Sequence, residues 1–226
     1  MIHKVNLQNK SIRNAGITKD YKEAISEYIW NGFDAKASII NIRFDDESGI
    51  EHIDEFEIED NGTGISYKEI EKTFGAFLVS PKADLSRSSY IQGKRGKGRF
   101  SFIRLGEAAI WNTSHYDKEE NLTYSYHIKI TSENAEDFDI DDNSIIKLKG
   151  KEKTGTLLTV LNTKLTTAHF KSEEFLDYLS SEFGWYLYLN RKNGFKIFIN
   201  DKELDYNRII SKKETIEWPL DEENNG

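Results

Sequence analysis

The sequence predicts a domain of the α+β class, and two observations lead to that prediction. Segments with apolar residues at the helical period, residues 20–38 and 172–189, lie among segments that alternate apolar and polar residues as β-strands do. Several of the strand-like segments follow one another with only short polar turns between them, which is typical of antiparallel pairing. We therefore expect helices beside a sheet with several antiparallel strands.

Composition limits the class of protein. The 226 residues suit one domain, or one domain and the start of a second, and 37% of them are hydrophobic, which is enough for a core. A net charge of −8 argues against a chain whose whole surface coats nucleic acid or an anionic membrane. No cysteine, signal peptide or long apolar run is found. We therefore expect a cytoplasmic protein that has no thiolate metal site and does not bind a membrane.

The first long helix is predicted from Asp20. Asp20 can cap the free amides, and Glu23 stands three residues later, as a capping box requires. The apolar stripe of this helix consists of Ala24, Ile25, Tyr28, Ile29 and Phe33.

Three polar residues share another face of the same helix. Glu27, Asn31 and Asp34 are spaced i, i+4 and i+7, which places them together and apart from the apolar stripe. A side-chain amide one turn from a carboxylate suits a bound Mg²⁺, because the amide oxygen can ligate the cation while the carboxylate accepts a proton from water. A solvated polar face is the plainer interpretation, and the helix alone leaves both open.

Two strands and a glycine-containing turn follow the helix. Residues 38–44 and 55–60 alternate apolar and polar residues, and the second strand ends at Asp60. Gly62 and Gly64 come next, before Ile65, and such glycines permit positive φ and a close approach of a ligand to the backbone. An isolated Asp-Asn-Gly is usually only a turn.

Residues 66–78 are predicted to be helical, and residues 80–99 form a long loop with six cationic residues and one acidic residue. A loop of this length inside a domain is usually a lid, a binding loop or disordered. Its end, "GKRGKGRFS", offers glycine amides and cations that suit phosphate groups, although it matches neither a Walker A nor a Rossmann pattern.

The rest of the chain predicts a short helix within 99–105, strands within 107–113, 121–131 and 154–162, and a closing strand, turn and strand at 194–205.

Taken in order, these motifs resemble those of the GHKL ATPase family. The motifs are Glu27-x3-Asn31-x2-Asp34, Asp60-x-Gly62-x-Gly64, Gly93-x2-Gly96-x-Gly98 and Gly155-Thr156. The family joins gyrase-class topoisomerases, ninety-kilodalton heat-shock chaperones, sensor histidine kinases and MutL, with MORC proteins as relatives. The resemblance covers residues 20–165, is closest to MutL and MORC proteins, and implies a Bergerat-type two-layer sandwich with helices on one face of a mixed, mostly antiparallel sheet.

The resemblance implies a role for each matching residue. Glu27 would be the catalytic base that activates water, and Asn31 would ligate Mg²⁺ between the ATP phosphates. Asp60 would accept a hydrogen bond from the adenine amino group, supported by Thr156. The remaining expected ATP-binding residues are Asp34, Gly62, Gly64 and Ile65, and, in the lid, Lys82, Gly93, Lys94, Arg95, Gly96, Lys97, Gly98 and Arg99. The chain departs from the chaperones at Lys94 and Arg95, and it has glycine at 32, where a close contact or a bend is expected.

The expected organisation is an N-terminal extension (1–19), an ATP-binding domain (20–205, with a lid at about 75–100) and a tail or the start of another domain (206–226). The resemblance implies Mg-dependent ATP binding and slow hydrolysis, used as a conformational switch linked to homodimerisation within a longer protein. Two alternatives stay open: a histidine-kinase-like phosphotransfer module, and a nucleic-acid-binding domain that uses the basic loop at 80–99.

Overall fold

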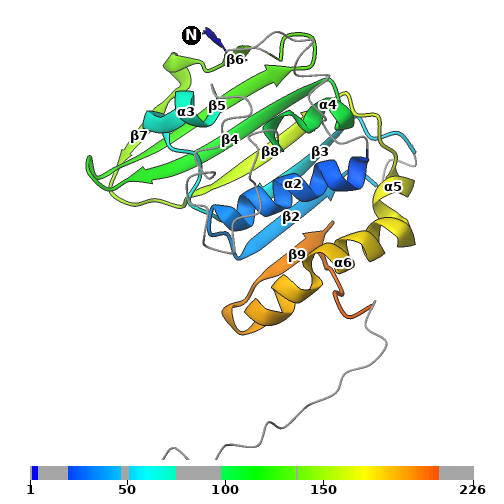
Figure 1. Ribbon diagram of the computed structural model, residues 1–226. Helices are drawn as coiled ribbons and strands as arrows, with labels where there is room; N and C mark the ends of the chain where they lie inside the picture. The colour runs from blue at the N-terminus through cyan, green and yellow to red at the C-terminus, as the bar shows by residue number, and fades with distance from the viewer. Residues whose placement is uncertain (1, 5–19, 47–50, 75–97, 136, 209–226) are drawn as a thin grey trace, which may run out of the picture.

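The computed structural model describes residues 2–4, 20–46, 51–74, 98–135 and 137–208. In this part of the chain ten strands form one sheet, and the helices pack against one face of it (Figure 1). The predicted α+β class is confirmed, and so is the mixed, mostly antiparallel character of the sheet.

The elements agree with the predicted periodic segments and add several short ones. The strands are β1 (Ile2–Lys4), β2 (Ile39–Phe44), β3 (Glu55–Asp60), β4 (Ala108–Asp117), β5 (Leu122–Thr131), β6 (Asp137–Asp139), β7 (Ile146–Lys149), β8 (Gly155–Leu161), β9 (Lys196–Ile199) and β10 (Lys202–Glu203). The α-helices are α2 (Tyr21–Asp34), α3 (Ile70–Phe74), α4 (Phe102–Leu105), α5 (Thr167–Lys171) and α6 (Glu173–Asn190). Single 3-10 turns occupy Tyr67–Glu69, Gly98–Phe100, Asp142–Ser144 and Arg191–Asn193.

The order of strands across the sheet is β1-β6-β5-β4-β8-β3-β2-β9-β10, with β7 pairing beside β5. The pair β2–β9 is parallel and the other pairs are antiparallel. The predicted helix over 66–78 is described only to Phe74, as a 3-10 turn followed by α3. Residues 75–78 and most of the expected lid lie outside the described residues.

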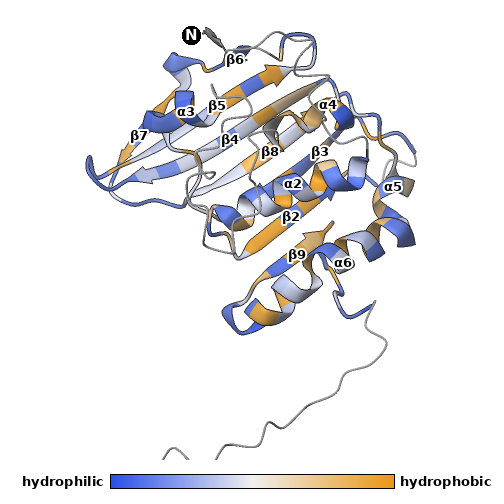
Figure 2. Cartoon of the chain, viewed as in Figure 1, coloured by the Kyte–Doolittle hydropathy of each residue, from blue (hydrophilic) through white to orange (hydrophobic). Residues whose placement is uncertain are grey.

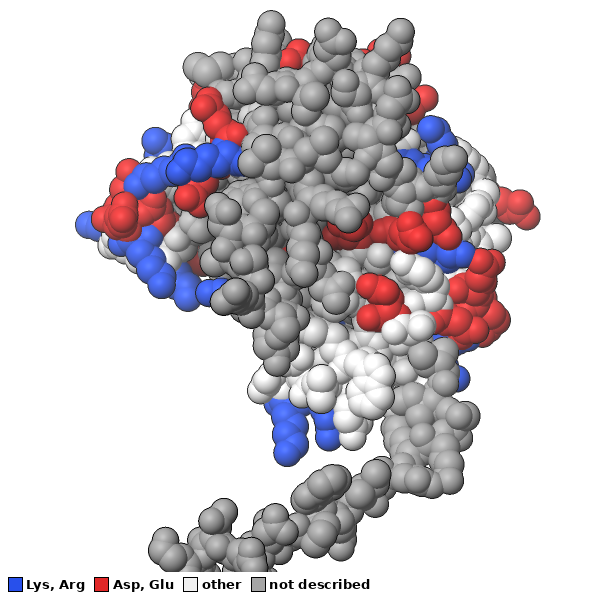
Figure 3. Space-filling view, viewed as in Figure 1, with Lys and Arg blue, Asp and Glu red and all other residues white. Residues whose placement is uncertain are grey.

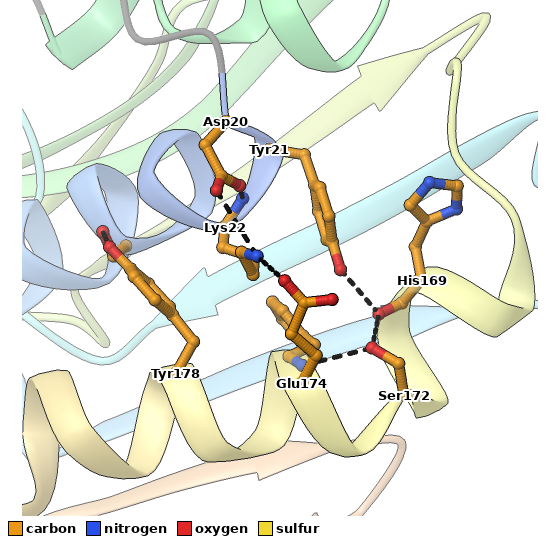
Figure 4. Close-up of polar contacts among 9 residues, drawn as sticks. Asp20, Tyr21, Lys22, His169, Ser172, Glu174 and Tyr178 are labelled. Atoms are coloured by element: carbon orange, nitrogen blue, oxygen red, sulfur yellow. Dashed lines mark hydrogen bonds and ion pairs between the residues drawn. The ribbon is translucent and has the colours of Figure 1, made fainter.

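Helix α2 begins where its cap residue predicts. The Asp20 carboxylate accepts a hydrogen bond from the backbone amide of Lys22 at 2.8 Å, and all five residues of the predicted apolar stripe are buried. Its first turn is tied to α5 and α6, as Figure 4 shows. There the Tyr21 hydroxyl donates to the His169 carbonyl at 3.2 Å, and the Lys22 ammonium pairs with Glu174. The start of α2 is therefore fixed both locally and by tertiary contacts.

Alternate residues of the central strands form apolar rows across the face of the sheet that the helices cover. One row joins Ile58 on β3, Leu158 on β8, Trp111 on β4 and Ile128 on β5, which stand directly opposite one another and are all buried. Figure 2 shows the apolar segments of strands β2 and β9 under the helices. Burial of such rows supplies most of the free energy that stabilises the fold.

Gly32 lets α2 lie close to the sheet, which confirms the close contact expected there. A Cβ at this position would come within 2.5 Å of the Ile40 Cδ1 atom and 3.1 Å of the Asp60 Cβ atom. The missing side chain therefore brings the helix turn that carries Asn31 directly over the end of β3.

Two glycine-to-alanine changes are expected to shift stability in opposite directions. Gly32→Ala should lower the free energy of unfolding by about 1–2 kcal/mol, because the overlap with buried Ile40 and with Asp60 outweighs the helix propensity gained. The matched control is Gly184→Ala inside α6, where the new methyl group meets nothing nearer than the Tyr206 carbonyl at 3.5 Å. This control should gain up to about 1 kcal/mol. Urea denaturation of both variants measures the difference, and equal stabilisation by the two would contradict the close approach at Gly32.

Candidate functional site

A row of polar residues continues the apolar rows at one end of the sheet. Asp60 on β3 stands opposite Thr156 on β8, Thr156 opposite Thr113 on β4, and Thr113 opposite Tyr126 on β5. We call these four residues the polar row. They share the strand phase of the buried residues Ile58 and Trp111, so they point to the face that the helices cover.

The loop after β3 is held over the polar row by hydrogen bonds. The backbone amide of Ile65 donates to the Thr113 hydroxyl at 2.9 Å, and the Tyr126 hydroxyl donates to the Ile65 carbonyl at 2.8 Å. Nearer to the strand, the Gly62 amide donates to the Asp60 carboxylate at 2.7 Å, and the Thr154 hydroxyl donates to the Gly62 carbonyl at 2.7 Å. Side chains from three strands, together with Thr154 just before β8, therefore fix the path of residues 61–65.

Gly64 is required by both conformation and space. Its φ of +69° lies in the left-handed region, and a Cβ would collide with the Ser114 carbonyl oxygen. The backbone at Gly64 and Ile65 thus lies in contact with β4. Because Gly64 has no side chain, a flat ligand can approach the backbone there closely.

The Asp60 carboxyl group has an unusual acidity. Burial raises its pKa from 3.8 to about 6, although the hydrogen bonds from the backbone amides of Gly62 and Thr156 act in the opposite direction. The nearby Glu59 charge adds a small further increase. A half-buried carboxylate of this kind is typical of binding and catalytic sites, because its desolvation is tolerated only where the charge is used.

The polar face of α2 lies beside the chain that follows the expected lid. Glu27 is exposed, whereas Asn31 and Asp34 are half-buried. A Cβ at Gly98 would lie 2.9 Å from the Glu27 Oε2 atom and 3.4 Å from the Asn31 Nδ2 atom. The backbone at Gly98 therefore lies directly against the predicted base and the predicted Mg²⁺ ligand.

A buried tyrosine holds this end of the lid in place. The Tyr28 hydroxyl accepts a hydrogen bond from the backbone amide of Phe102 at 2.7 Å, and burial raises the pKa of Tyr28. Tyr28 follows Glu27 in α2, and Phe102 begins α4 soon after Gly98. One side chain thus links the helix turn of Glu27 to the root of the lid.

The structure brings several of the predicted residues together. Asp60, Gly62, Gly64, Ile65 and Thr156 form one cluster at the polar row, and Glu27, Asn31 and Gly98 form a second. Gly32 joins the two clusters, because its Cα lies close to the Asp60 side chain.

Asp34 lies apart from these clusters in one respect. Its charge contributes to the raised pKa of Tyr186 on α6, for which burial is the larger cause, so Asp34 lies near that helix. Its role toward a nucleotide stays a prediction. Lys82, Gly93, Lys94, Arg95, Gly96 and Lys97 lie outside the described residues, and for Arg99 only the backbone is described.

Four residues of the site were not predicted as site residues from the sequence: Thr113, Tyr126, Thr154 and Tyr28. One signal was available for Thr113, because it continues the alternation of the buried residues Ala109 and Trp111 and is itself only 3% exposed. A hydroxyl in an apolar strand phase needs a partner, and such a position therefore indicates a polar network. The partners themselves depend on strand register and could not be identified.

The surface gives limited support to the nucleic-acid alternative. Figure 3 shows Asp and Glu side chains gathered on the right of one face of the molecule. The acidic residues near the starts of α2 and α6 that form ion pairs with Lys22 and Arg208 are Asp20, Glu173, Glu174 and Asp177. Such a surface repels a phosphate backbone. That alternative rests on residues 80–99, of which 80–97 lie outside the described part, and so it stays a prediction.

The described residues do not form a metal site made of protein side chains alone. Among them no group of three or more His, Asp or Glu side chains is placed to hold a metal ion by itself. No helix among them has the length and apolar character needed to cross a membrane. A single amide ligand such as Asn31 remains compatible with Mg²⁺, because this cation usually keeps several waters and binds through substrate phosphates.

Comparison with known proteins shows the family of the chain. A model of the family described as histidine kinase-, DNA gyrase B- and HSP90-like ATPases matches residues 19–156, which is more than half of the chain. This range begins just before α2 and ends at Thr156, so it contains both clusters. No curated protein matches the sequence.

Proposed function

Because the chain belongs to the histidine kinase-, DNA gyrase B- and HSP90-like ATPase family, we propose that it binds Mg-ATP at the polar row and hydrolyses it slowly. The observation that carries the proposal is the position of Gly32, which brings the turn of α2 next to Asn31 within contact distance of Asp60. This proximity supports a site in which β3 recognises the base and α2 carries the phosphate chemistry.

The proposed base site is the end of β3. The Asp60 carboxylate accepts a hydrogen bond from the exocyclic amino group of adenine, and the backbone at Gly64 lets the purine ring lie flat against the loop. The fixed path of residues 61–65 supports this assignment, because a preorganised loop costs little entropy when the ligand binds.

The proposed phosphate site lies at Asn31, Glu27 and Gly98. The Asn31 amide oxygen suits Mg²⁺, and the metal when bound neutralises phosphate charge. The absence of a side chain at Gly98 lets its backbone lie against Glu27 and Asn31, where this proposal puts the phosphate oxygens. The Glu27 carboxylate accepts the proton of the attacking water. The cationic residues of 82–99 complete the site in this proposal.

Asn31→Ala tests the proposed metal ligand. Mg²⁺ should strengthen ATP binding to the unaltered protein, and the variant should lose roughly tenfold or more of that gain, because it lacks the amide oxygen. The matched control is Asn112→Ala on β4, where the side chain is exposed and alternates with buried Trp111 and Thr113. Calorimetric titration of ATP with and without Mg²⁺ measures both variants.

The outcomes of this titration are distinct. If Mg²⁺ strengthens ATP binding to Asn31→Ala as much as to the unaltered protein, Asn31 is not the metal ligand and another residue holds Mg²⁺. A folded unaltered protein that binds no ATP would overturn the proposed function.

The proposal extends to a switch. Nucleotide orders the lid, the closed lid favours a homodimer, and hydrolysis returns the domain to its first state, all within a longer protein that carries further domains. The link between Tyr28 and Phe102 supports this part, because it transmits movement between the lid root and α2. Sedimentation velocity with and without a non-hydrolysable ATP analogue measures the dimer, and an unchanged monomer would remove this part of the proposal.

A further inference from the structure

The Thr113 hydroxyl has three polar contacts but only one proton to donate. Its Oγ1 atom lies 2.9 Å from the Ile65 amide nitrogen, 3.2 Å from the Gly155 carbonyl oxygen and 3.1 Å from the Thr156 Oγ1 atom. The side chain is 3% exposed, so water does not compete for these contacts.

Counting donors and acceptors assigns the direction of each bond. A threonine hydroxyl donates one hydrogen bond and accepts two. The Ile65 amide can only donate, so Thr113 accepts from it, and the Gly155 carbonyl can only accept, so Thr113 donates to it. The Thr156 hydroxyl must then donate to Thr113 if all three contacts are hydrogen bonds. The proton of Thr156 is thereby directed at Thr113, and only the lone pairs of its oxygen remain for another group.

This direction has a consequence for the polar row. Thr156 stands directly opposite Asp60, and both then present acceptors. Two neighbouring acceptors match a group with two hydrogens to donate, such as the exocyclic amino group of adenine. A keto group at the same place, as in hypoxanthine or guanine, would put a third acceptor against them and leave buried lone pairs unpaired.

We infer that Thr113 is a positioning residue that sets the choice of a 6-amino over a 6-keto purine, by fixing the hydroxyl of Thr156 as an acceptor. This inference rests on the proposed function, because it assumes that the nucleobase lies at Asp60. Without the Thr113 hydroxyl, Thr156 is free to rotate and donate to a keto oxygen, while Asp60 accepts from the ring N–H beside it.

The test compares ATP with inosine triphosphate, in which a keto group replaces the 6-amino group. Thr113→Val keeps the shape of the side chain and removes the hydroxyl. The ratio of the two affinities should fall by about tenfold, which corresponds to one hydrogen bond of about 1.4 kcal/mol. Thr113→Ser keeps the hydroxyl and should keep the ratio.

Thr123→Val is the matched structural control. Thr123 is 1% exposed, donates to the Gly150 carbonyl at 2.8 Å and accepts from the Glu152 amide at 3.0 Å. Its loss therefore removes a buried hydroxyl with two backbone partners from β5, outside the polar row. This variant should lose stability as Thr113→Val does and leave the affinity ratio unchanged.

Calorimetric titration of the full chain with each nucleotide gives the result. The inference is supported if the ratio of ATP affinity to inosine triphosphate affinity falls in Thr113→Val and in neither of the other two variants. A Thr113→Val protein that loses affinity for both nucleotides in proportion, or a Thr113→Ser protein with the same change in ratio, overturns it, because Thr113 would then be only structural. If Thr113→Val does not fold, Thr113→Cys takes its place, since a thiol is a weak donor and acceptor. An unaltered protein that binds neither nucleotide overturns the proposed function as well.

Discussion

Asp60→Asn is expected to reduce ATP affinity by at least about a hundredfold, because a charged acceptor is lost and an amide donor can face the adenine amino group. The hydrogen bond from the backbone amide of Gly62 holds the Asp60 side chain at the end of β3. The side chain therefore cannot move away to relieve the mismatch. Calorimetric titration with Mg-ATP measures the change. The matched control is Glu59→Gln, one residue earlier on the same strand, which removes a neighbouring charge on the opposite face of the sheet.

The same variant is expected to gain stability at neutral and alkaline pH. Asp60 has a raised folded-state pKa of about 6 against 3.8, so its favourable contribution is present below about pH 4 and is lost as the pH rises through 6. At pH 8 the unaltered protein therefore carries a buried charge that asparagine does not. After allowance for partial exposure we expect a gain of about 1–2 kcal/mol at pH 8 and little difference at pH 4. Urea denaturation at both pH values measures it.

Stability and binding thus change in opposite directions, which separates a functional role from a structural one. A destabilised Asp60→Asn protein that also loses ATP would indicate that the carboxylate supports the fold instead. The acidity of Asp60 further implies that ATP affinity of the unaltered protein falls as the pH is lowered through about 6, because the protonated carboxyl donates where it had accepted.

Much of this architecture could be predicted because it follows from local patterns. The apolar stripe of α2 and the cap at Asp20 are set by residues within a few turns, and both lie where the periodicity predicts. The phase of β3 likewise put Asp60 at a strand end. The glycine at 32 indicated a close contact without saying with what, because its neighbours Ile40 and Asp60 meet it only after the strands assemble.

The parts that could not be predicted depend on pairing between distant segments. Strands β6 and β7 are short, and β1 at the N-terminal end pairs with β6 in the middle of the chain, so no local window identifies them. The alternation within its own segment indicates that Thr113 is buried but does not identify its partners. Thr113 becomes part of the site only because the register of β4 with β8 sets it opposite Thr156, and because the loop after β3 returns its Ile65 amide to the same hydroxyl.

Glu27→Gln is expected to lower the rate of phosphate release by roughly 10²–10⁴-fold while ATP still binds, because glutamine has nearly the same shape and cannot accept the proton of the attacking water. Glu27 is exposed, so water can reach its carboxylate, and only the backbone of Gly98 lies close beside it. Glu23→Gln, one turn earlier on α2 and also exposed, is the matched control and should release phosphate normally.

A steady-state phosphate assay together with calorimetry on the same samples separates the possible results. Release that stops while binding persists assigns the base to Glu27. Release that continues at the original rate would place the base on another residue and leave Glu27 to a solvated helix face. γ-Phosphate labelling of the protein or of an added histidine-containing partner, in place of free phosphate, would favour the phosphotransfer alternative, because a kinase of this family needs the nucleotide pocket and no activated water. The chemistry at one carboxylate therefore decides between the hydrolysing and the transferring forms of the same fold.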